Sequence, residues 1–197
     1  STGHGFSKFY NKYFYQIKNK NISILEIGSY AGASAAAFVK FLPNAKVYCF
    51  DINISNYKYF SKNIEVYGID VNNKKKVEKL LNKIFLKKNF NGFDYIIDDG
   101  SHNLSDILSS LNLFFKHLKS RGFYIIEDYK HPNYYSYNKN VNHILIDELL
   151  EKFKNKEFFS SDYITGEEQN SLFYSIKKIS TYKGNLKDSD ICFIEKN

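Results

Sequence analysis

Paired carboxylates end two apolar segments of the chain. Residues 93–99 read Phe-Asp-Tyr-Ile-Ile-Asp-Asp, and His102 follows Asp99 by three residues; residues 124–128 read Tyr-Ile-Ile-Glu-Asp and end in Glu127 and Asp128. If the two segments are neighbouring strands, their ends lie about 5 Å apart. Clustered negative charge is costly, and a hard divalent cation with oxygen ligands relieves it. The pattern therefore predicts a Mg²⁺ site at Asp99, Glu127 and Asp128.

His102 is placed to take a proton from a hydroxyl group bound at such a site, because an imidazole titrates near neutral pH. Asp99 and His102 are therefore the predicted catalytic residues. Helix capping is the alternative role for Asp99, Asp128 and His102, since each precedes a candidate helix or turn. Capping accounts for one of the acids more readily than for three acids at two strand ends.

A second candidate site begins at a glycine turn. Residues 24–32 read Ile-Leu-Glu-Ile-Gly-Ser-Tyr-Ala-Gly, an apolar strand that enters a helix through Gly28, Ser29 and Gly32. Glycines permit a positive φ and a close approach of the backbone, and the free N–H groups of a helix start favour an anionic group. Tight packing between strand and helix is the alternative explanation of the glycines.

Two acids extend this second site. Asp51 ends the next strand, where it can accept hydrogen bonds from both ribose hydroxyls of an adenosine ligand. Asp70 ends the third strand and could meet the adenine amino group. The spacing of the glycines differs from that of a dinucleotide site, and Glu26 resembles the acid that precedes the glycines in class I methyltransferases. S-adenosylmethionine (SAM) is therefore favoured over NAD.

Strands and helices alternate along the first two thirds of the chain. The pattern predicts strands at 22–27, 46–51, 64–69, 93–97 and 122–126, and helices at 33–42, 74–85 and 103–118. This order predicts an α/β fold of the Rossmann-like, doubly wound class, with a mainly parallel sheet and helices on both faces. Ligands of such folds collect at the carboxyl ends of the strands, where every motif above lies.

The remaining segments flank this unit. Apolar residues at helical spacing predict an amphipathic helix over residues 1–20, which could shield a bound ligand. Residues 130–142 are polar and rich in Tyr, and we predict a lid loop before a helix at 143–153. Residues 171–179 and 190–195 are predicted to form a C-terminal antiparallel hairpin, whereas 157–170 has no clear pattern. The length favours a single domain over residues 1–197.

The composition narrows the classes of partner. The net charge is +7, but the lysines are scattered and the chain has no nucleic-acid-binding motif, so we expect no nucleic-acid partner. No apolar stretch approaches the roughly 20 residues that span a bilayer, and no signal-peptide pattern is present. Cys49 and Cys192 lie in apolar strands, as buried reduced thiols do. A cytoplasmic protein without a membrane partner is expected.

Taken together, these motifs resemble those of the macrocin and mycinamicin sugar O-methyltransferases, a family with cephalosporin hydroxylase-like relatives. The resemblance covers most of the chain. It includes the opening from Gly3 to Tyr10, the Leu-Glu-Ile-Gly turn, Phe-Leu-Pro-Asn-Ala before the second strand, Asp-Asp-Gly-Ser-His and Ile-Ile-Glu-Asp. The last two motifs are the more specific ones.

The resemblance implies transfer of a methyl group from SAM to a hydroxyl of a sugar, a glycosylated natural product or a polysaccharide. It implies Mg²⁺ at Asp99, Glu127 and Asp128, with His102 as the general base and SAM at Gly28, Gly32 and Asp51. Relatives commonly self-associate, so a homo-oligomer is compatible with it. The segment after Asp128 does not match the family pattern. Two alternatives stay open: a catechol-type small-molecule O-methyltransferase, and a SAM- or glycan-binding module without turnover.

Overall fold

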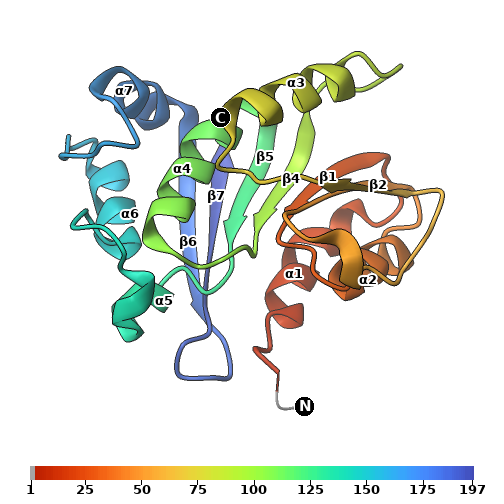
Figure 1. Cartoon of the computed structure of the whole chain (residues 1–197), viewed down its shortest axis with the longest axis horizontal. Coiled ribbons are helices and arrows are strands. Elements are labelled where there is room, and N and C mark those ends of the chain that lie inside the picture. Colours follow the sequence, from red (N-terminus) through yellow and green to blue (C-terminus); the bar gives the residue numbers. More distant parts are fainter. Residues whose placement is uncertain (1–2) are drawn as a thin grey trace.

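The computed structural model describes residues 3–197, which form a seven-stranded sheet in the order β3-β2-β1-β4-β5-β7-β6 (Figure 1). Strands β1 to β5 run parallel, β7 is antiparallel to β5, and β6 is antiparallel to β7. The strands are β1 (Ile22–Ile27), β2 (Ala45–Asp51), β3 (Ile64–Gly68), β4 (Phe93–Asp98), β5 (Leu118–Ile126), β6 (Ile176–Lys183) and β7 (Asp190–Lys196). The predicted doubly wound sheet with a C-terminal antiparallel hairpin is confirmed.

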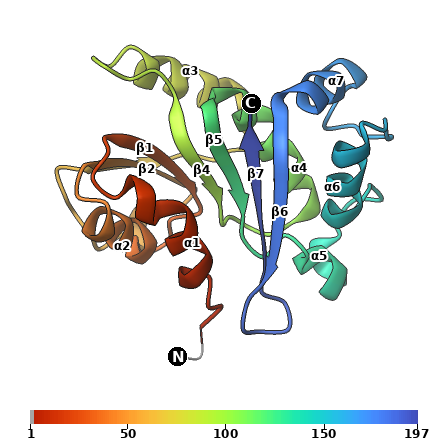
Figure 2. The ribbon, with the colours of Figure 1, turned by 180° about the vertical axis from the view of Figure 1, so that it is seen from behind.

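Helices cover both faces of the sheet (Figures 1 and 2). One face packs against α3, α4, α6 and α7, and the other against α1 and α2. The helices are α1 (Ser7–Phe14), α2 (Ala33–Phe41), α3 (Lys74–Phe85), α4 (Leu104–Phe114), α5 (His131–Tyr134), α6 (Ile146–Asn155) and α7 (Gly166–Ser175). The central strands are thus buried on both sides, which explains why they appear in the sequence as nearly continuous apolar runs.

Apolar spacing explains the helices in the same way. In α3, Val77, Leu81 and Ile84 are buried against the sheet, and the side chain of Asn73 accepts a hydrogen bond from the backbone N–H of Lys76 at the helix start. The spacing of three and four residues places these apolar side chains on one stripe. Burial of each contributes about 1.5 to 3 kcal/mol.

The C-terminal hairpin starts later than predicted. Residues 171–175 belong to α7, and β6 begins only at Ile176. A capping box fixes the start of this helix, because Thr165 and Glu168 each accept a hydrogen bond from the other's backbone N–H. The buried neighbours Leu172 and Phe173 point into the core from the helix, an arrangement that does not follow the period of two expected of a strand.

Three other segments differ from their predicted form. The N-terminal helix is shorter, α1 being followed by the 3-10 turn η1 (Tyr15–Ile17). The helix predicted to reach residue 118 ends at Phe114, the 3-10 turn η3 (Phe115–His117) follows, and β5 starts directly after it. The expected loop over 130–142 contains α5 and the 3-10 turn η4 (Ser136–Asn138). A proline in the first turn of α5 favours this helix start.

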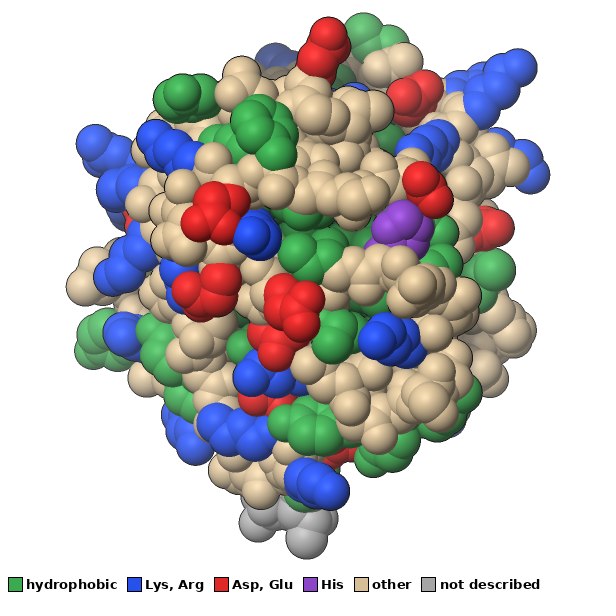
Figure 3. Space-filling model, turned by 90° about the vertical axis from the view of Figure 1, so that its left-hand side faces the viewer, with side chains coloured by type: hydrophobic (Ala, Val, Ile, Leu, Met, Phe, Trp, Pro, Cys, Tyr) green, Lys and Arg blue, Asp and Glu red, His purple; other side chains and the backbone are tan. Residues whose placement is uncertain are grey.

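The surface carries mixed charge. On the face formed by the helices at the left of Figure 1, lysines are interspersed with carboxylates (Figure 3). Two ion pairs of α6 illustrate this, with Lys152 Nζ lying 2.6 Å from Glu157 and Lys154 Nζ lying 2.6 Å from Glu151. Within residues 3–197, no helix has the length and apolar character needed to cross a bilayer.

Candidate active site

The carboxyl ends of the central strands meet at one end of the sheet. The Gly28 N–H donates to Phe50 O at 2.8 Å, the Asp99 N–H to Ile27 O at 2.9 Å, and the Glu127 N–H to Asp98 O at 3.0 Å. These bonds extend the parallel hydrogen-bond ladder beyond the strand ends, so the carboxyl ends of β1, β2, β4 and β5 lie side by side. The N-terminal segment, α5 and the turn between β6 and β7 lie at this same end (Figures 1 and 2).

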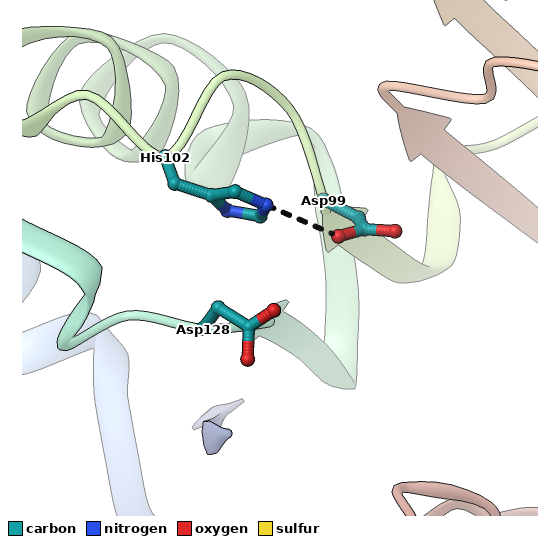
Figure 4. A group of neighbouring side chains, drawn as sticks. All are labelled: Asp99, His102 and Asp128. Atoms are coloured by element: carbon teal, nitrogen blue, oxygen red, sulfur yellow. Dashed lines mark ion pairs between the residues drawn. The ribbon is translucent and has the colours of Figure 1, made fainter. Parts of the chain in front are cut away.

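Asp99, His102 and Asp128 converge there from two loops. Each offers a ligand atom, and these atoms lie within 4.8 Å of one another. His102 Nε2 lies 3.7 Å from Asp99 Oδ1, with Asp128 facing the same space from the end of β5 (Figure 4). His102 and Asp128 both have a positive φ, a conformation that L-residues seldom adopt and that here directs the backbone around the site. The juxtaposition of the two strand ends therefore matches the sequence-based expectation.

Glu127 has a different neighbourhood from the other two predicted metal ligands. The Tyr10 hydroxyl, from α1, donates a hydrogen bond of 2.5 Å to Glu127 Oε1. Glu127 also lines a groove of about 620 Å³ between α1 and α2, beside Phe14 and Phe38. The structure thus groups Asp99 and Asp128 with His102, while Glu127 lies next to them and is held by the N-terminal helix.

The electrostatics of this cluster favour a bound cation. Burial, followed by the charge of Glu127, raises the pKa of Asp99 to about 9, and burial raises the pKa of Glu127 to about 7. Burial also raises the pKa of Asp128. Among residues 3–197, no lysine or arginine forms an ion pair with these three carboxylates. An oxygen-rich donor set with no lysine or arginine partner in the described part of the chain fits a hard divalent ion such as Mg²⁺.

His102 is neutral in this environment. Burial, with smaller contributions from the charges of His131 and His4, lowers its pKa to about 4. A neutral imidazole has one nitrogen free to accept a proton, so the side chain can act as a base at pH 7.

The glycine turn borders a cleft of about 330 Å³ at the ends of β1, β2 and β4. Gly28, Asp51, Asp70 and Asp99 line it. Gly28 has φ +84°, and a Cβ at this position would lie 2.1 Å from the carbonyl oxygen of Asp99. Glycine is therefore required for the strand end to pass this close to the loop after β4.

Asp51 is fixed at the rim of this cleft. Its carboxylate accepts hydrogen bonds from the backbone N–H groups of Tyr30, at 2.7 Å, and Asn53, at 2.8 Å. A carboxylate oxygen has two lone pairs, so each retains one acceptor position for a ligand hydroxyl. Asp70, on the far side, accepts from the backbone N–H of Asn72 at 2.9 Å.

The other predicted cofactor residues lie outside the lining of this cleft. Glu26 is buried beneath the first turn of α2, where it accepts hydrogen bonds from Ser34 Oγ and, at 3.6 Å, from Cys49 Sγ. Ser29 is buried in the turn. A Cβ on Gly32, whose φ is +80°, would lie 2.4 Å from the ring of Tyr57. The packing alternative thus accounts for Gly32 without a ligand.

Residues not assigned a role from the sequence complete the surroundings. His4 Nδ1 lies 3.1 Å from Asp128 Oδ2 and 2.9 Å from Ser189 Oγ. The ring of His131 lies 5.4 Å from that of His102. His4 and Tyr10 belong to the opening motif from Gly3 to Tyr10, and this motif could have identified them from the sequence. No sequence motif points to His131.

Comparisons with known proteins identify relatives in sequence and in fold. Residues 25–129, more than half of the chain, match the sequence model of a family described as a methyltransferase domain. Mycinamicin VI 2''-O-methyltransferase of Micromonospora griseorubida is 26% identical over 132 residues, and demethylmacrocin O-methyltransferase of Streptomyces fradiae is 27% identical over 132 residues. The predicted resemblance to the mycinamicin and macrocin enzymes is confirmed.

A solved structure shares the fold. The MycE methyltransferase of the mycinamycin biosynthetic pathway, in a complex with Mg, SAH and mycinamycin VI, superposes with a TM-score of 0.72 at 20% identity and covers 97% of this chain. The chain spans only part of these proteins. The two sequence matches cover 64% of the chain but 31% and 32% of the curated relatives, and the structural match covers 49% of the solved chain.

Proposed function

Because the chain belongs to the methyltransferase-domain family, we propose that it transfers a methyl group from SAM to a hydroxyl of a sugar or glycosylated small molecule, with Mg²⁺ bound. The observation that carries the proposal is the convergence of Asp99, His102 and Asp128 within 4.8 Å, beside the cleft at the glycine turn. Asp99 lines this cleft and belongs to the cluster, so the two sites share a wall. A methyl donor in one would lie next to a hydroxyl in the other.

The cleft has the groups that SAM needs. Asp51, held by two backbone N–H groups, would accept hydrogen bonds from the ribose, and Asp70 would lie toward the adenine. The absence of a side chain at Gly28 lets the end of β1 pack directly against the backbone of Asp99, which lines the same cleft. Glu26 and Ser29, buried behind the turn, would support its shape without touching the donor.

The carboxylate cluster would hold the metal and the acceptor. SAM supplies the methyl group, and Mg²⁺ when bound lowers the pKa of the acceptor hydroxyl. Asp99 and Asp128 offer oxygen ligands. Glu127 would add a third with the oxygen that Tyr10 does not occupy. His102, neutral at pH 7, would accept the proton of the acceptor hydroxyl, and its contact with Asp99 orients its ring.

Sugars are the favoured acceptors because of the relatives. One curated relative is named mycinamicin VI 2''-O-methyltransferase, a second demethylmacrocin O-methyltransferase, and a third, whose name includes a glycosyl group, L-olivosyl-oleandolide 3-O-methyltransferase. A catechol would offer two adjacent oxygens to the same carboxylates, so the cluster alone does not distinguish the two classes of acceptor.

The test is transfer of a labelled methyl group from SAM to a panel of deoxysugar glycosides and catechols, with Mg²⁺ or EDTA. We expect labelling of a glycoside that EDTA abolishes and Mg²⁺ restores. In the Asp128→Ala variant, added Mg²⁺ should not restore labelling of the glycoside. Labelling of catechols alone would indicate a catechol-type O-methyltransferase instead. Full turnover in EDTA would refute the metal site, and SAM binding without transfer would indicate a non-catalytic module.

A further inference from the structure

Aromatic side chains form a continuous row that leads away from His102. The ring of His131 lies 5.4 Å from that of His102, the ring of Tyr135 lies 4.3 Å from His131, and the ring of Tyr137 lies 5.6 Å from Tyr135. We call His131, Tyr135 and Tyr137 the aromatic strip. His131 lies in α5, Tyr137 in η4 and Tyr135 between them, at the end of the sheet where the carboxylates lie (Figure 1).

Two anchors fix the strip relative to His102. The side chain of Asn138, only 4% exposed, donates hydrogen bonds to Ser101 O at 3.1 Å and to Asn103 Oδ1 at 3.0 Å, the residues on either side of His102. On the other side, the Tyr135 hydroxyl donates to Asp188 Oδ2 at 2.9 Å, in the turn between β6 and β7. The strip is therefore tied to the loop that carries the proposed base.

The strip is nevertheless uncovered. Tyr137 is 72% exposed and Tyr135 is 37% exposed. Exposed aromatic faces next to a reactive site suit a ligand with an apolar face and polar edges, because a tyrosine presents the same combination. A pyranose ring has this character, with C–H groups on its faces and hydroxyls around its rim. A nearby carboxylate, Asp188, could accept hydrogen bonds from rim hydroxyls.

We propose that the aromatic strip is an acceptor subsite, on which a pyranose ring of the acceptor stacks against Tyr135 and Tyr137 while a hydroxyl reaches the carboxylate cluster. The proposal rests on the proposed function, since it assigns the strip to the acceptor of that reaction. It adds the location of the acceptor and the chemical feature by which the acceptor is recognised, a pyranose with an apolar face.

The experiment measures contact between the sugar and the strip. The protein is loaded with Mg²⁺ and with S-adenosylhomocysteine (SAH), the form of SAM that has lost its methyl group. It is then mixed with methyl 6-deoxyhexopyranosides of several configurations. Its aromatic protons are then saturated, and the transfer of saturation to the C–H protons of the sugar is recorded by NMR. Tyr137→Ala removes the most exposed ring, Tyr137→Phe keeps the ring, and Tyr15→Ala removes a ring of similar exposure, 69%, at a distant position.

We expect saturation transfer in wild type, Tyr137→Phe and Tyr15→Ala, and a loss of about three- to tenfold in glycoside affinity in Tyr137→Ala, the size expected for one aromatic face. The affinity for S-adenosylhomocysteine should stay the same in all four proteins. Undiminished transfer in Tyr137→Ala would overturn the proposal, as would an absence of sugar contact in wild type that binds S-adenosylhomocysteine.

Two further outcomes separate the proposals. If wild type fails to bind S-adenosylhomocysteine, the proposed function is refuted and the strip cannot be the acceptor subsite of that reaction, although loss of sugar contact in Tyr137→Ala would still locate a sugar on the strip. If wild type self-associates and Tyr137→Ala alone becomes a monomer with unchanged sugar contact, the strip is a contact between copies and the subsite is refuted.

Discussion

The hydroxyl of Tyr10 links the N-terminal helix to the carboxylate cluster, and Tyr10→Phe removes only this group. The hydrogen bond to Glu127 Oε1 measures 2.5 Å and joins residues 117 positions apart. Hydrogen bonds to buried charged groups contribute about 1.5 to 3 kcal/mol, which is roughly 10- to 150-fold in an equilibrium constant. Removal of partners that orient metal ligands weakens metal binding by about 10- to 100-fold. We expect Tyr10→Phe to weaken Mg²⁺ binding within this range.

Calorimetric titration of Mg²⁺ into the protein loaded with S-adenosylhomocysteine measures the effect. Tyr13→Phe is the matched control, because Tyr13 lies on the same helix and its hydroxyl lies 2.9 Å from the hydroxyl of Tyr182, away from the carboxylates. Thermal unfolding, followed by circular dichroism, reports whether either variant disturbs the packing of α1. The affinity for S-adenosylhomocysteine should be the same in both variants.

Unchanged Mg²⁺ affinity in a folded Tyr10→Phe variant would refute the reasoning, since it would mean that Glu127 needs no orientation by α1 or does not bind the metal. An equal loss in both variants would also contradict it, because the effect would then arise from packing of the helix rather than from the hydrogen bond to Glu127.

Three further predictions concern the donor, the base and the charge of the cluster. Asp51→Ala should weaken SAM binding by about 10- to 100-fold with little loss of stability; calorimetry showing wild-type affinity would remove Asp51 from the SAM site. His102→Ala should lower kcat by about 10²- to 10⁴-fold while SAM and Mg²⁺ still bind, and steady-state kinetics with an identified acceptor would test this. The folded-state pKa of Asp99, about 9, lies above its ordinary value of 3.8, so its contribution to stability is present below pH 4 and is lost as the pH rises toward 9. The metal-free protein should therefore melt at a lower temperature at pH 8.5 than at pH 6, and Mg²⁺ should raise the melting temperature more at pH 8.5. Scanning calorimetry that shows a higher melting temperature at pH 8.5 for the metal-free protein would contradict the raised pKa of Asp99.

The sheet could be predicted because each strand has a recognisable pattern in its own local sequence. Buried parallel strands such as Ile22–Ile27 have few polar positions, and the turn residues between elements mark where each strand ends. The error over residues 171–175 has the opposite origin. Leu172 and Phe173 form a short apolar pair that fits a strand or a helix, and the capping box at Thr165 and Glu168 decides between them from outside the segment.

The site could be predicted in part for a similar reason. Asp99 and Asp128 follow apolar strands, so the topology alone brings them to one end of the sheet. The orientation of their side chains depends on groups far away in the sequence. Tyr10 holds Glu127, and His4 contacts Asp128 from the N-terminal segment, contacts that no local pattern specifies.

Glu26 shows how a residue can shape the site without facing a ligand. It lies behind the turn at Gly28, hydrogen-bonded to Ser34, and burial raises its own pKa. Burial is also the main cause of the raised pKa of Asp99 and of Glu127, and the charge of Glu26, when it is ionised, adds a smaller contribution to both. A buried acid in this position makes the adjacent carboxylates harder to ionise unless a cation enters the cluster. The same acid therefore strengthens the coupling between metal binding and deprotonation of Asp99, because a bound cation offsets the charge of all of these groups at once. An acidic residue ahead of a glycine turn can thus act on the metal site through its charge while the turn itself borders the cleft for the methyl donor.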